Sequence, residues 1–398
     1  MSNLAQQLPP LPALSATVTG LNPSGSDGWE ILHEARGLKA AGKQVIDLTI
    51  GDHDRVTPAE ILDAMDASAR GGHTGYAAVP GTDSLRDAIA ERVAARTGVP
   101  THRANVLVTA GGQAALFAAL RGTASNGDTV LFVDPYYATY PGTIRGVSAV
   151  PHAIEARPDA AFQLEERDFG GLPRASALLV NTPNNPTGVV YTPETLDTVA
   201  AHVISEGQWL ISDEVYDGHV WNGRHVSPRA LPGMAERTLV IGSMSKSHAM
   251  TGSRIGWLLG PERVIERLAE LLTVTTYGVP GFIQDAAEAA LRTGDAIEAD
   301  LAATYRRRRD LALAALEGTR RLTVVPPDGA MYIMVDVRRT GLSGDAFARR
   351  LLEAEGVAVM PGESFGRAAA GHVRVALTAA EASLADALGR LSAFAAAQ

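Results

Sequence analysis

The chain has 398 residues, 46% hydrophobic and 20% charged, which is enough for two domains with sizeable cores. Its formal net charge of -9 argues against non-specific binding to nucleic acid or to an anionic membrane surface, and the absence of cysteine excludes disulfides, thiolate-bound metals and a cysteine nucleophile. There is neither an apolar run long enough for a membrane span nor a signal peptide, so the expected location is the cytoplasm.

The N-terminal segment is expected to form an arm, a helix and a short strand. Residues 1–15 are rich in Pro and Leu without periodicity, as in an arm. A cap at Ser24 opens a helix that ends at Gly42. An apolar strand over 45–50 then ends at Gly51.

Two further helices flank a glycine-rich loop. The sequence Thr-Pro-Ala-Glu at 57–60 predicts a capping box, with proline at the first helical position of a helix that runs to about Arg70. The loop over 71–81 exposes Tyr76, and a second helix is expected over 84–96.

From residue 105 onward, short apolar strands alternate with helices or long connections. This alternation indicates a mostly parallel sheet covered by helices on both faces, an α/β fold. A strand within 254–260 follows too soon for a crossover helix, so we expect it to be antiparallel in the same sheet. The other expected strands cover residues 106–109, 129–133, 177–180, 209–212 and 238–241.

The C-terminal part is predicted to be α+β. A helix over 261–271 precedes one long helix from Pro280 to about Leu316, and two more helices alternate with strands over 330–335, 357–360 and 372–376. The expected divisions are residues 1–45, an arm and helix that pack with the small domain; 46–285, the large domain; and 286–398, the small C-terminal domain.

Lys246 is unusual because the chain has only two other lysines, Lys39 and Lys43. Those two lie at i, i+4 in a polar N-terminal segment, whereas Lys246 follows an apolar strand and lies among hydroxyl residues. An amine with a lowered pKa can form an imine with an aldehyde, and an arginine cannot. Taken alone, the segment around Lys246, residues 242–257, could also be a surface turn.

Groups suited to a phosphate lie near this lysine or at another strand end. Ser243 and Ser245 offer hydroxyls, and Arg254 offers a guanidinium that matches phosphate oxygens. Gly111 and Gly112 lie where a strand passes into a helix, so their backbone N–H groups could approach an anion. An ordinary tight turn is the alternative for the glycine pair.

Side chains suited to a flat, protonated ring follow three further strands. Tyr137 could stack on a ring, with core packing as the alternative, and Asn185 lies in a turn held by two prolines. Asp213 ends a buried strand and needs a partner, either a protonated pyridine nitrogen or an arginine. Because ligands bind outside the carboxyl ends of strands in such sheets, five strand ends with these residues predict a pyridoxal phosphate (PLP) site.

The chain resembles the class I and II aminotransferases, which are fold type I PLP-dependent enzymes of the aspartate/aromatic aminotransferase kind. The resemblance extends from about residue 21 to 391 and is carried by NNPTG at 184–188, SDEVY at 212–216 and SMSKSHAMTGSRIG at 243–256. It implies a large domain with a mostly parallel central sheet, a smaller α+β domain and the cofactor pyridoxal 5′-phosphate.

The resemblance also implies roles for the candidate residues. Lys246 would bind the cofactor aldehyde and move a proton from the substrate Cα. Asp213 would pair with the pyridine nitrogen, Asn185 and Tyr216 would bond the ring hydroxyl, and Tyr137 would stack on the ring. The residues that would hold the phosphate are Gly111, Gly112, Gln113, Ser243, Ser245 and Arg254.

Substrate contacts and assembly follow from the same resemblance. Arg374 would bind the α-carboxylate of an amino acid or 2-oxo acid, assisted by Asn185 and by the backbone at Gly51. A solvated edge-strand arginine is the alternative for Arg374. Tyr76 would reach the phosphate of a neighbouring subunit, which implies a homodimer.

The chain departs from the family pattern at two places. Where the family often has Gly-Glu-Pro-Asp-Phe, residues 51–55 read Gly-Asp-His-Asp-Arg, so the roles of His53 and Arg55 are open, with His53 a candidate for the pocket rim. Gln113 stands where relatives with acidic substrates often have lysine, so a preference for aspartate is not supported. The loops expected to contact the substrate side chain include residues 16–24.

These features predict transfer of the amino group of an aromatic or other neutral L-amino acid to a 2-oxo acid such as 2-oxoglutarate. The same scaffold also carries cystathionine-type C–S β-lyases, aminocyclopropane-carboxylate synthases and decarboxylases. A PLP-binding transcription regulator would need a basic N-terminal winged helix, which is not expected here, and a silent PLP binder would not need a complete catalytic set.

Overall fold

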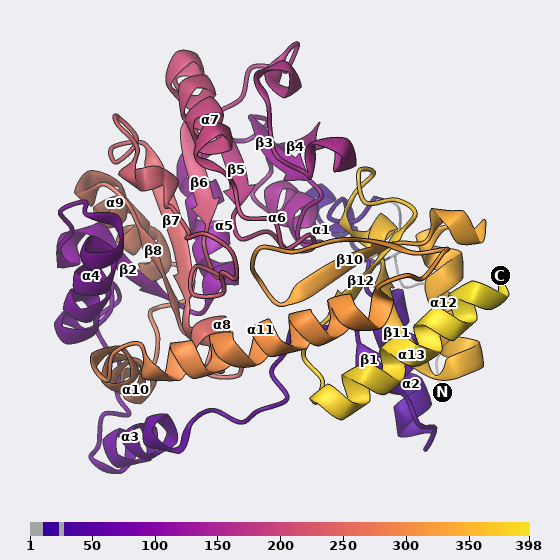
Figure 1. Ribbon diagram of the computed structural model, residues 1–398. Coiled ribbons are helices and arrows are strands. Elements are labelled where there is room, and N and C mark those ends of the chain that lie inside the picture. The colour runs from indigo at the N-terminus through magenta and orange to yellow at the C-terminus, as the bar shows by residue number, and fades with distance from the viewer. Residues whose placement is uncertain (1–10, 24–27) are drawn as a thin grey trace, which may run out of the picture.

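A computed structural model of the protein describes residues 11–23 and 28–398. Expectations for residues 1–10 and for the cap at Ser24 lie outside the described residues. Figure 1 shows two sheets with helices packed around each of them. None of the helices in the described part of the chain has the length and apolar character that a bilayer crossing requires.

The larger sheet has seven strands in the order β2-β8-β7-β6-β5-β3-β4. Only β8 runs antiparallel to its neighbours, which confirms the mostly parallel sheet and the antiparallel strand predicted within residues 254–260. The strands are β2 (Val106–Thr109), β3 (Thr129–Asp134), β4 (Val150–Glu155), β5 (Ala177–Asn181), β6 (Trp209–Asp213), β7 (Thr238–Ser243) and β8 (Gly256–Leu259).

Alternate residues of these strands pack on opposite faces. In β7, Leu239 and Ile241 join a core with α5 and α9, whereas Val240 joins a core with α3, α4 and α10. This period of two is expected of a sheet that is buried on both sides. The helices around this sheet are α3 (Ala59–Arg70), α4 (Asp83–Thr97), α5 (Gly112–Thr123), α6 (Tyr140–Gly146), α7 (Pro193–Glu206), α9 (Glu262–Thr273) and α10 (Gly281–Arg292).

The smaller sheet has five strands in the order β1-β11-β12-β10-β9. Strand β1 (Ile46–Leu48) is parallel to β11 (Val357–Pro361), so a segment near the N-terminus completes a sheet formed by the C-terminal part. The domain divisions after residues 45 and 285 stay a prediction. The other elements are β9 (Thr323–Val325), β10 (Tyr332–Asp336), β12 (His372–Ala376), α2 (Glu30–Ala40), α11 (Ala296–Leu316), α12 (Gly344–Glu355) and α13 (Glu381–Ala397).

Two local predictions were wrong. The single helix expected from Pro280 to Leu316 is interrupted between α10 and α11, where Gly294 adopts a left-handed φ of 80°. Thr57 does not cap α3, because its hydroxyl donates a hydrogen bond of 2.6 Å to the carbonyl of Ala249, and the helix begins after Pro58 without a side-chain cap. Strands β4 and β9, both at sheet edges, were not predicted.

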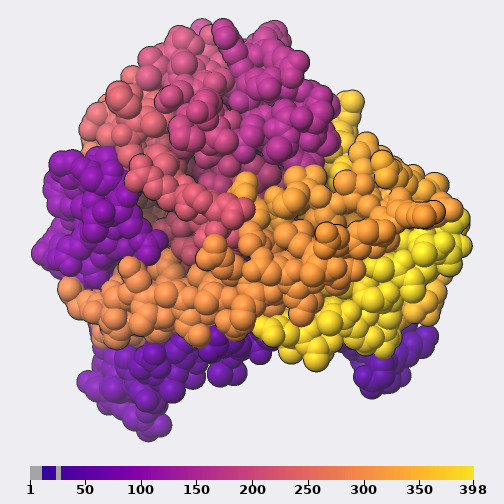
Figure 2. Space-filling view, in the orientation of Figure 1, coloured from indigo at the N-terminus to yellow at the C-terminus, as the bar shows by residue number. Residues whose placement is uncertain are grey.

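Helix α11 is fixed at its N-terminal end by buried ion pairs. Glu298 is 3% exposed, and its carboxylate lies 2.8 Å from the guanidinium of Arg92 and 2.9 Å from that of Arg96, both on α4. Figure 2 shows α11 as an orange band that crosses one face of the molecule and meets α13, in yellow. The helix therefore links α4, beside the larger sheet, to the C-terminal elements.

The buried carboxylate of Glu298 is expected to stabilise the fold measurably. Glu298→Gln should lower the free energy of unfolding by about 2 kcal/mol, because the two arginines lose a buried charge but keep Asp217 as a partner. Urea unfolding followed by circular dichroism measures the change. The exposed pair of Arg267 and Glu270 gives a control, since Glu270→Gln should change stability by less than about 0.5 kcal/mol. Equal effects from the two variants would contradict this account.

Candidate active site

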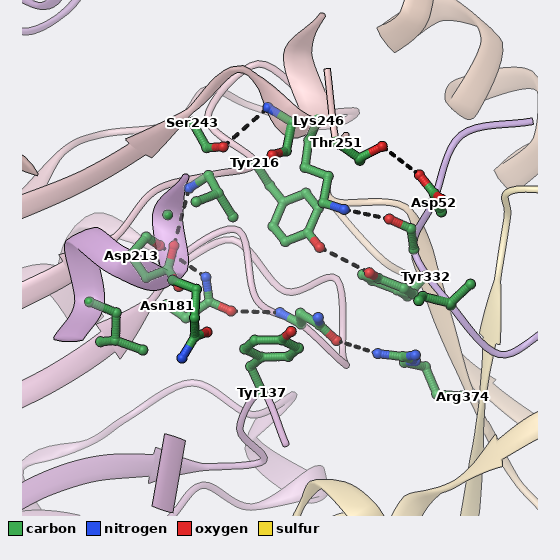
Figure 3. A pocket seen from close by; sticks show the side chains of 18 of the residues that line it. Asp52, Tyr137, Asn181, Asp213, Tyr216, Ser243, Lys246, Thr251, Tyr332 and Arg374 are labelled. Atoms are coloured by element: carbon green, nitrogen blue, oxygen red, sulfur yellow. Dashed lines mark hydrogen bonds between the residues drawn. The ribbon is translucent and has the colours of Figure 1, made fainter. Parts of the chain in front are cut away.

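A cavity of about 470 Å³ lies where the ends of β5, β6 and β7 face β10 and β12 of the smaller sheet (Figure 3). Side chains from both sheets line it, so the site requires the two sheets to pack together. It brings together predicted residues from distant parts of the chain. Those that line it are Gly51, Gly112, Gln113, Tyr137, Asn185, Asp213, Tyr216, Ser243, Ser245, Lys246, Arg254 and Arg374.

Lys246 lies in α8 (Met244–Ser247), the single turn that follows β7. Its Nζ donates a hydrogen bond to the carbonyl of Gly51 (Figure 3). Burial lowers the pKa of Lys246 to about 8, with smaller contributions from the cations Arg374 and Arg254, while the nearby carboxylate of Asp52 opposes the shift. A larger fraction of the amine is therefore neutral near pH 7 than for an exposed lysine.

Asp213 is the last residue of β6 and is 8% exposed. Its carboxylate accepts hydrogen bonds from the hydroxyl of Tyr140, at 2.7 Å, and from the backbone N–H of Val215, at 3.3 Å. Burial raises the pKa of Asp213 to about 6, and these two hydrogen bonds counter the shift. No arginine pairs with this carboxylate among the described residues, so the ordinary salt bridge considered as an alternative is not formed.

Backbone N–H groups and a guanidinium meet at the N-terminus of α5. Gly111 has a φ of 81°, and a Cβ at this position would lie 2.6 Å from Nη2 of Arg254, so only glycine permits this approach. Arg254 itself has a positive φ of 52°, and its guanidinium donates a hydrogen bond of 2.9 Å to the carbonyl of Thr251. The hydroxyl of Ser243 accepts from the N–H of Ser245 at 3.1 Å. The arrangement suits a phosphate.

Gln113 follows this pair of glycines and carries no charge into the cavity. Its amide donates to the hydroxyl of Thr143 at 2.9 Å and accepts from that of Thr139 at 3.2 Å. Two threonines around α6 therefore hold the side chain in place.

The ring-binding candidates are connected by hydrogen bonds. The hydroxyl groups of Tyr216 and Tyr332 lie 2.9 Å apart (Figure 3). The amide of Asn181 donates to the backbone carbonyl of Asp213 at 2.9 Å and accepts from the N–H of Asn185 at 2.8 Å. The ends of β5 and β6 are thus fixed to each other.

Arg374 lies in β12, the central strand of the smaller sheet, and is 1% exposed. Its guanidinium lies 4.3 Å from the ring centres of both Tyr332 and Phe365. Nη1 donates to Asn185 at 2.8 Å, Nη2 donates to the carbonyl of Thr49, and the buried Nε has no partner among the described residues. The alternative of a solvated edge-strand arginine is therefore wrong.

Four of the residues discussed in the sequence are not among those that line the cavity, and one of them, Gly111, directly precedes the lining residue Gly112. Tyr76 is 90% exposed and makes an edge contact of 5.1 Å with Tyr277. His53 is not among the residues that line the cavity, and its Nδ1 lies 2.8 Å from the hydroxyl of Tyr305. Arg55 pairs with Asp300 at 2.7 Å. The prediction of His53 at the pocket rim was therefore wrong.

Several cavity residues were not predicted. Asn181 ends a predicted strand, so the rule applied to Asp213 could have identified it. Tyr332 comes from the smaller sheet, and no local sequence pattern predicts how that sheet packs against the larger one. Arg36 comes from α2, and Trp29 directly precedes that helix. Tyr140 does not line the cavity but supports Asp213 from α6.

The residues present fit PLP in three respects. A buried carboxylate that has no cationic partner in the described part of the chain lies at the end of β6, and a buried lysine with a lowered pKa follows β7. The glycines at the start of α5 and the guanidinium of Arg254 form a cradle that a Cβ at Gly111 would fill. Pyridinium, aldehyde and phosphate each require one of these groups.

Comparisons with known proteins agree with this chemistry. The family model for aminotransferase class I and II matches residues 43–391. The arginine–pyruvate transaminase AruH of Pseudomonas aeruginosa is 40% identical to this chain, over 92% of this chain and 94% of that protein. The aspartate/prephenate aminotransferase of Thermus thermophilus is 36% identical, over 95% and 98% of the two chains.

Solved structures show the same fold over nearly the whole chain. An aspartate aminotransferase from Thermus thermophilus with maleate matches with a TM-score of 0.90 at 34% identity, over 96% of this chain and 100% of that chain. An aspartate aminotransferase from Thermotoga maritima matches with a TM-score of 0.90 at 30% identity. The chain therefore belongs to the class I and II aminotransferases, PLP-dependent enzymes of fold type I that transaminate amino acids.

Proposed function

We propose that this chain transfers the amino group of an L-amino acid to a 2-oxo acid and that Lys246 is its catalytic residue. The supporting observation is that a buried amine with a lowered pKa shares one cavity with the carboxylate of Asp213 and the guanidinium of Arg374. When bound, PLP supplies an aldehyde for the amino group and a conjugated ring that accepts electrons from the substrate Cα.

The residues of the chain would bind this cofactor as the sequence predicts. Asp213 would hold the protonated ring nitrogen, and Asn185 and Tyr216 would bond the ring hydroxyl. Tyr137 would lie against the ring. The phosphate would be held by Gly111, Gly112, Gln113, Ser243, Ser245 and Arg254.

Lys246 would take the proton from the substrate Cα and return it on the cofactor side. A pKa of about 8 suits this task, because the amine can accept and release a proton near neutral pH. Arg374 would bind the α-carboxylate with its planar guanidinium, held between two rings. Asn185 and the backbone around Gly51, which border the same space, would assist.

Arg36 supports 2-oxoglutarate as the amino acceptor. It lines the cavity from α2 and has no hydrogen bond or ion pair among the described residues. The other cations of the cavity, Lys246, Arg254 and Arg374, already have proposed partners. An acceptor with a second carboxylate would give Arg36 a partner.

The donor is proposed to be an aromatic or other neutral amino acid. Trp29 and Tyr137 lie with ring centres 6.5 Å apart on the cavity wall, and Gln113 offers no cation. Asp52 favours a basic donor as a second candidate, because its carboxylate lines the cavity and receives a hydrogen bond of 2.8 Å from Thr251. A relative named arginine–pyruvate transaminase is consistent with that second candidate.

We also propose a homodimer in which Tyr76 reaches the active site of the neighbouring subunit. Large side chains around this residue are exposed in the single chain, including Tyr277 at 52% and Val274 at 79%. Such a patch is typical of an interaction surface. The cytoplasmic location stays a prediction.

Replacement of Lys246 tests the catalytic assignment. Lys246→Ala should abolish turnover and the visible absorption of bound cofactor, because no other lysine lines the cavity. Circular dichroism and sedimentation should show an unchanged fold and dimer. Borohydride treatment of the native protein should attach the cofactor to residue 246, and labelling of Lys39 or Lys43 instead would refute the proposal.

A panel of single substrates tests the reaction and the acceptor. Rapid mixing of the holoenzyme with single amino acids should show conversion to the pyridoxamine form, fastest with the true donor. Arg36→Gln should raise the KM for 2-oxoglutarate about tenfold and leave that for pyruvate unchanged, because pyruvate has no second carboxylate. Equal changes for both acids would exclude Arg36 as the site of the second carboxylate.

The same panel distinguishes a lyase from a transaminase. Release of pyruvate and ammonia from cysteine conjugates would indicate a C–S β-lyase. Formation of glutamate equal to the oxo acid produced would indicate transamination. Asp52→Asn is the matched variant for the donor, since it should weaken only basic donors if the second candidate is correct.

A further inference from the structure

The loop between β1 and α3 contacts both residues proposed to act on the substrate. The carbonyl of Gly51 accepts a hydrogen bond from Nζ of Lys246, and the carbonyl of Thr49 accepts one from Nη2 of Arg374. Two carbonyls, two residues apart, therefore orient the amine and the guanidinium. Gly51 allows a close approach, because a Cβ there would lie 1.8 Å from the hydroxyl of Tyr332.

The next residues of the same loop bond to α11. The ring of His53 lies 2.8 Å from the hydroxyl of Tyr305, through Nδ1. The carboxylate of Asp54 receives two hydrogen bonds, of 2.7 and 3.0 Å, from the guanidinium of Arg308. Arg55 pairs with Asp300 at 2.7 Å. We call these bonds the loop–helix contact.

Two of the three residue pairs in this contact differ in strength because their side chains differ in exposure. The side chains of Arg55 and Asp300 are 47% and 60% exposed, so this pair contributes little. Arg308 and Asp54 are 6% and 28% exposed, and their two-point geometry makes this pair stronger. The guanidinium of Arg308 also donates a hydrogen bond of 3.1 Å to the carbonyl of Leu377. This bond fixes the guanidinium independently of the loop.

His53 lies between the helix and the catalytic lysine. Its ring centre is 5.5 Å from that of Tyr305, and burial, helped by the charge of Lys246, lowers the pKa of His53 to about 4. The buried His219 lies at the same ring distance of 5.5 Å from Tyr305. The histidine is thus held in a packed layer directly behind Lys246.

Helix α11 can act as a fixed support for the loop. Its N-terminal end is anchored to α4 by the buried carboxylate of Glu298, and its later turns pack on α13 and β9. It also contacts α8, the turn that carries Lys246 (Figure 1). The loop therefore lies between one rigid helix and the two functional side chains.

We propose that Asp54 and His53 are positioning residues, which hold the carbonyls of Thr49 and Gly51 through α11 so that Lys246 and Arg374 face the substrate together. Of the two, His53 departs from the pattern of the family, whereas Asp54 matches it. The inference rests on the roles proposed for Lys246 and Arg374. It assigns neither residue a contact with substrate.

Labelling of Lys246 in the cofactor-free protein tests the proposal without any turnover. The chain has only three lysines, so Lys39 and Lys43 serve as internal references for trinitrobenzenesulfonate, with the sites quantified by mass spectrometry. In the native chain, labelling of Lys246 should rise with pH through about 8, as the amine loses its proton. Loss of the carbonyl acceptor favours the neutral amine and opens access to it, and both effects speed labelling.

Two variants weaken the loop–helix contact from opposite sides. Asp54→Asn removes the charge facing Arg308, and Tyr305→Phe removes the hydroxyl facing His53 while keeping its ring. Each should raise the labelling rate of Lys246 at pH 7 about tenfold relative to the reference lysines. If Asp54→Asn fails to fold, Tyr305→Phe still decides the matter, because it deletes a single oxygen.

A matched control lies on the same helix. Arg307→Gln removes a bond to Glu381 rather than to the loop, and should leave labelling of Lys246 unchanged. In the holoenzyme, Asp54→Asn and Tyr305→Phe should each lower kcat and raise the KM of both substrates. A chain that is merely destabilised would instead lose active protein while its KM stays unchanged. Unchanged labelling of Lys246 in a folded Tyr305→Phe protein would overturn the proposal.

The outcome is separate from that of the proposed function. If Lys246→Ala retained activity, the catalytic assignment would fail, yet the labelling result would still show whether the loop holds the lysine. If Lys246 proves catalytic and its labelling is the same in all folded variants, only the positioning role is refuted.

Discussion

The chemistry of the site depends on a single amine that is kept out of water. Burial of Lys246 disfavours its charged form and lowers its pKa to about 8. The cations Arg374 and Arg254 act in the same direction, and the hydrogen bond to the carbonyl of Gly51 gives the ammonium form a partner. The packing of two sheets around a short turn thus makes a lysine reactive.

This burial is a consequence of topology. Strands β5, β6 and β7 are adjacent and parallel, so Asn181, Asp213 and Ser243, the last residues of these strands, lie at one edge. The smaller sheet closes that edge with Tyr332 and Arg374. Strand β1 is part of this second sheet, and the loop that follows it contacts the side chain of Lys246, whose Nζ donates to the carbonyl of Gly51. The cavity therefore lies between the larger sheet and a smaller sheet that combines segments from near both ends of the chain.

Sequence patterns predicted the parts of the site that follow local rules. Lys246, Asp213 and Asn185 lie at or a few residues beyond the ends of apolar strands, and the strand-end rule places them together. The rule could not find Tyr140, which reaches Asp213 from α6, or Tyr332, which comes from the other sheet. These contacts depend on how separate elements pack, and packing has no signal in a local pattern.

The same limit explains the local errors. The sequence around Thr57 fits a capping box, in which its hydroxyl would accept from a helix N–H, but the hydroxyl instead donates to the carbonyl of Ala249, nearly two hundred positions away. The apolar pattern continues from Pro280 to Leu316, but the helix does not, because Gly294 adopts a left-handed conformation between α10 and α11. In each case a tertiary contact or one backbone conformation outweighed a local preference.

The missing side chain at position 51 lets the loop after β1 lie against Tyr332, on β10 of the same sheet. The hydroxyl of Tyr332 occupies the space that a methyl group would need, and the same hydroxyl bonds to Tyr216. Any larger residue would displace the phenol of Tyr332 and so disturb its hydrogen bond to Tyr216, which follows a strand of the larger sheet. The absence of one carbon atom thus preserves a direct link between the two sheets at the cavity.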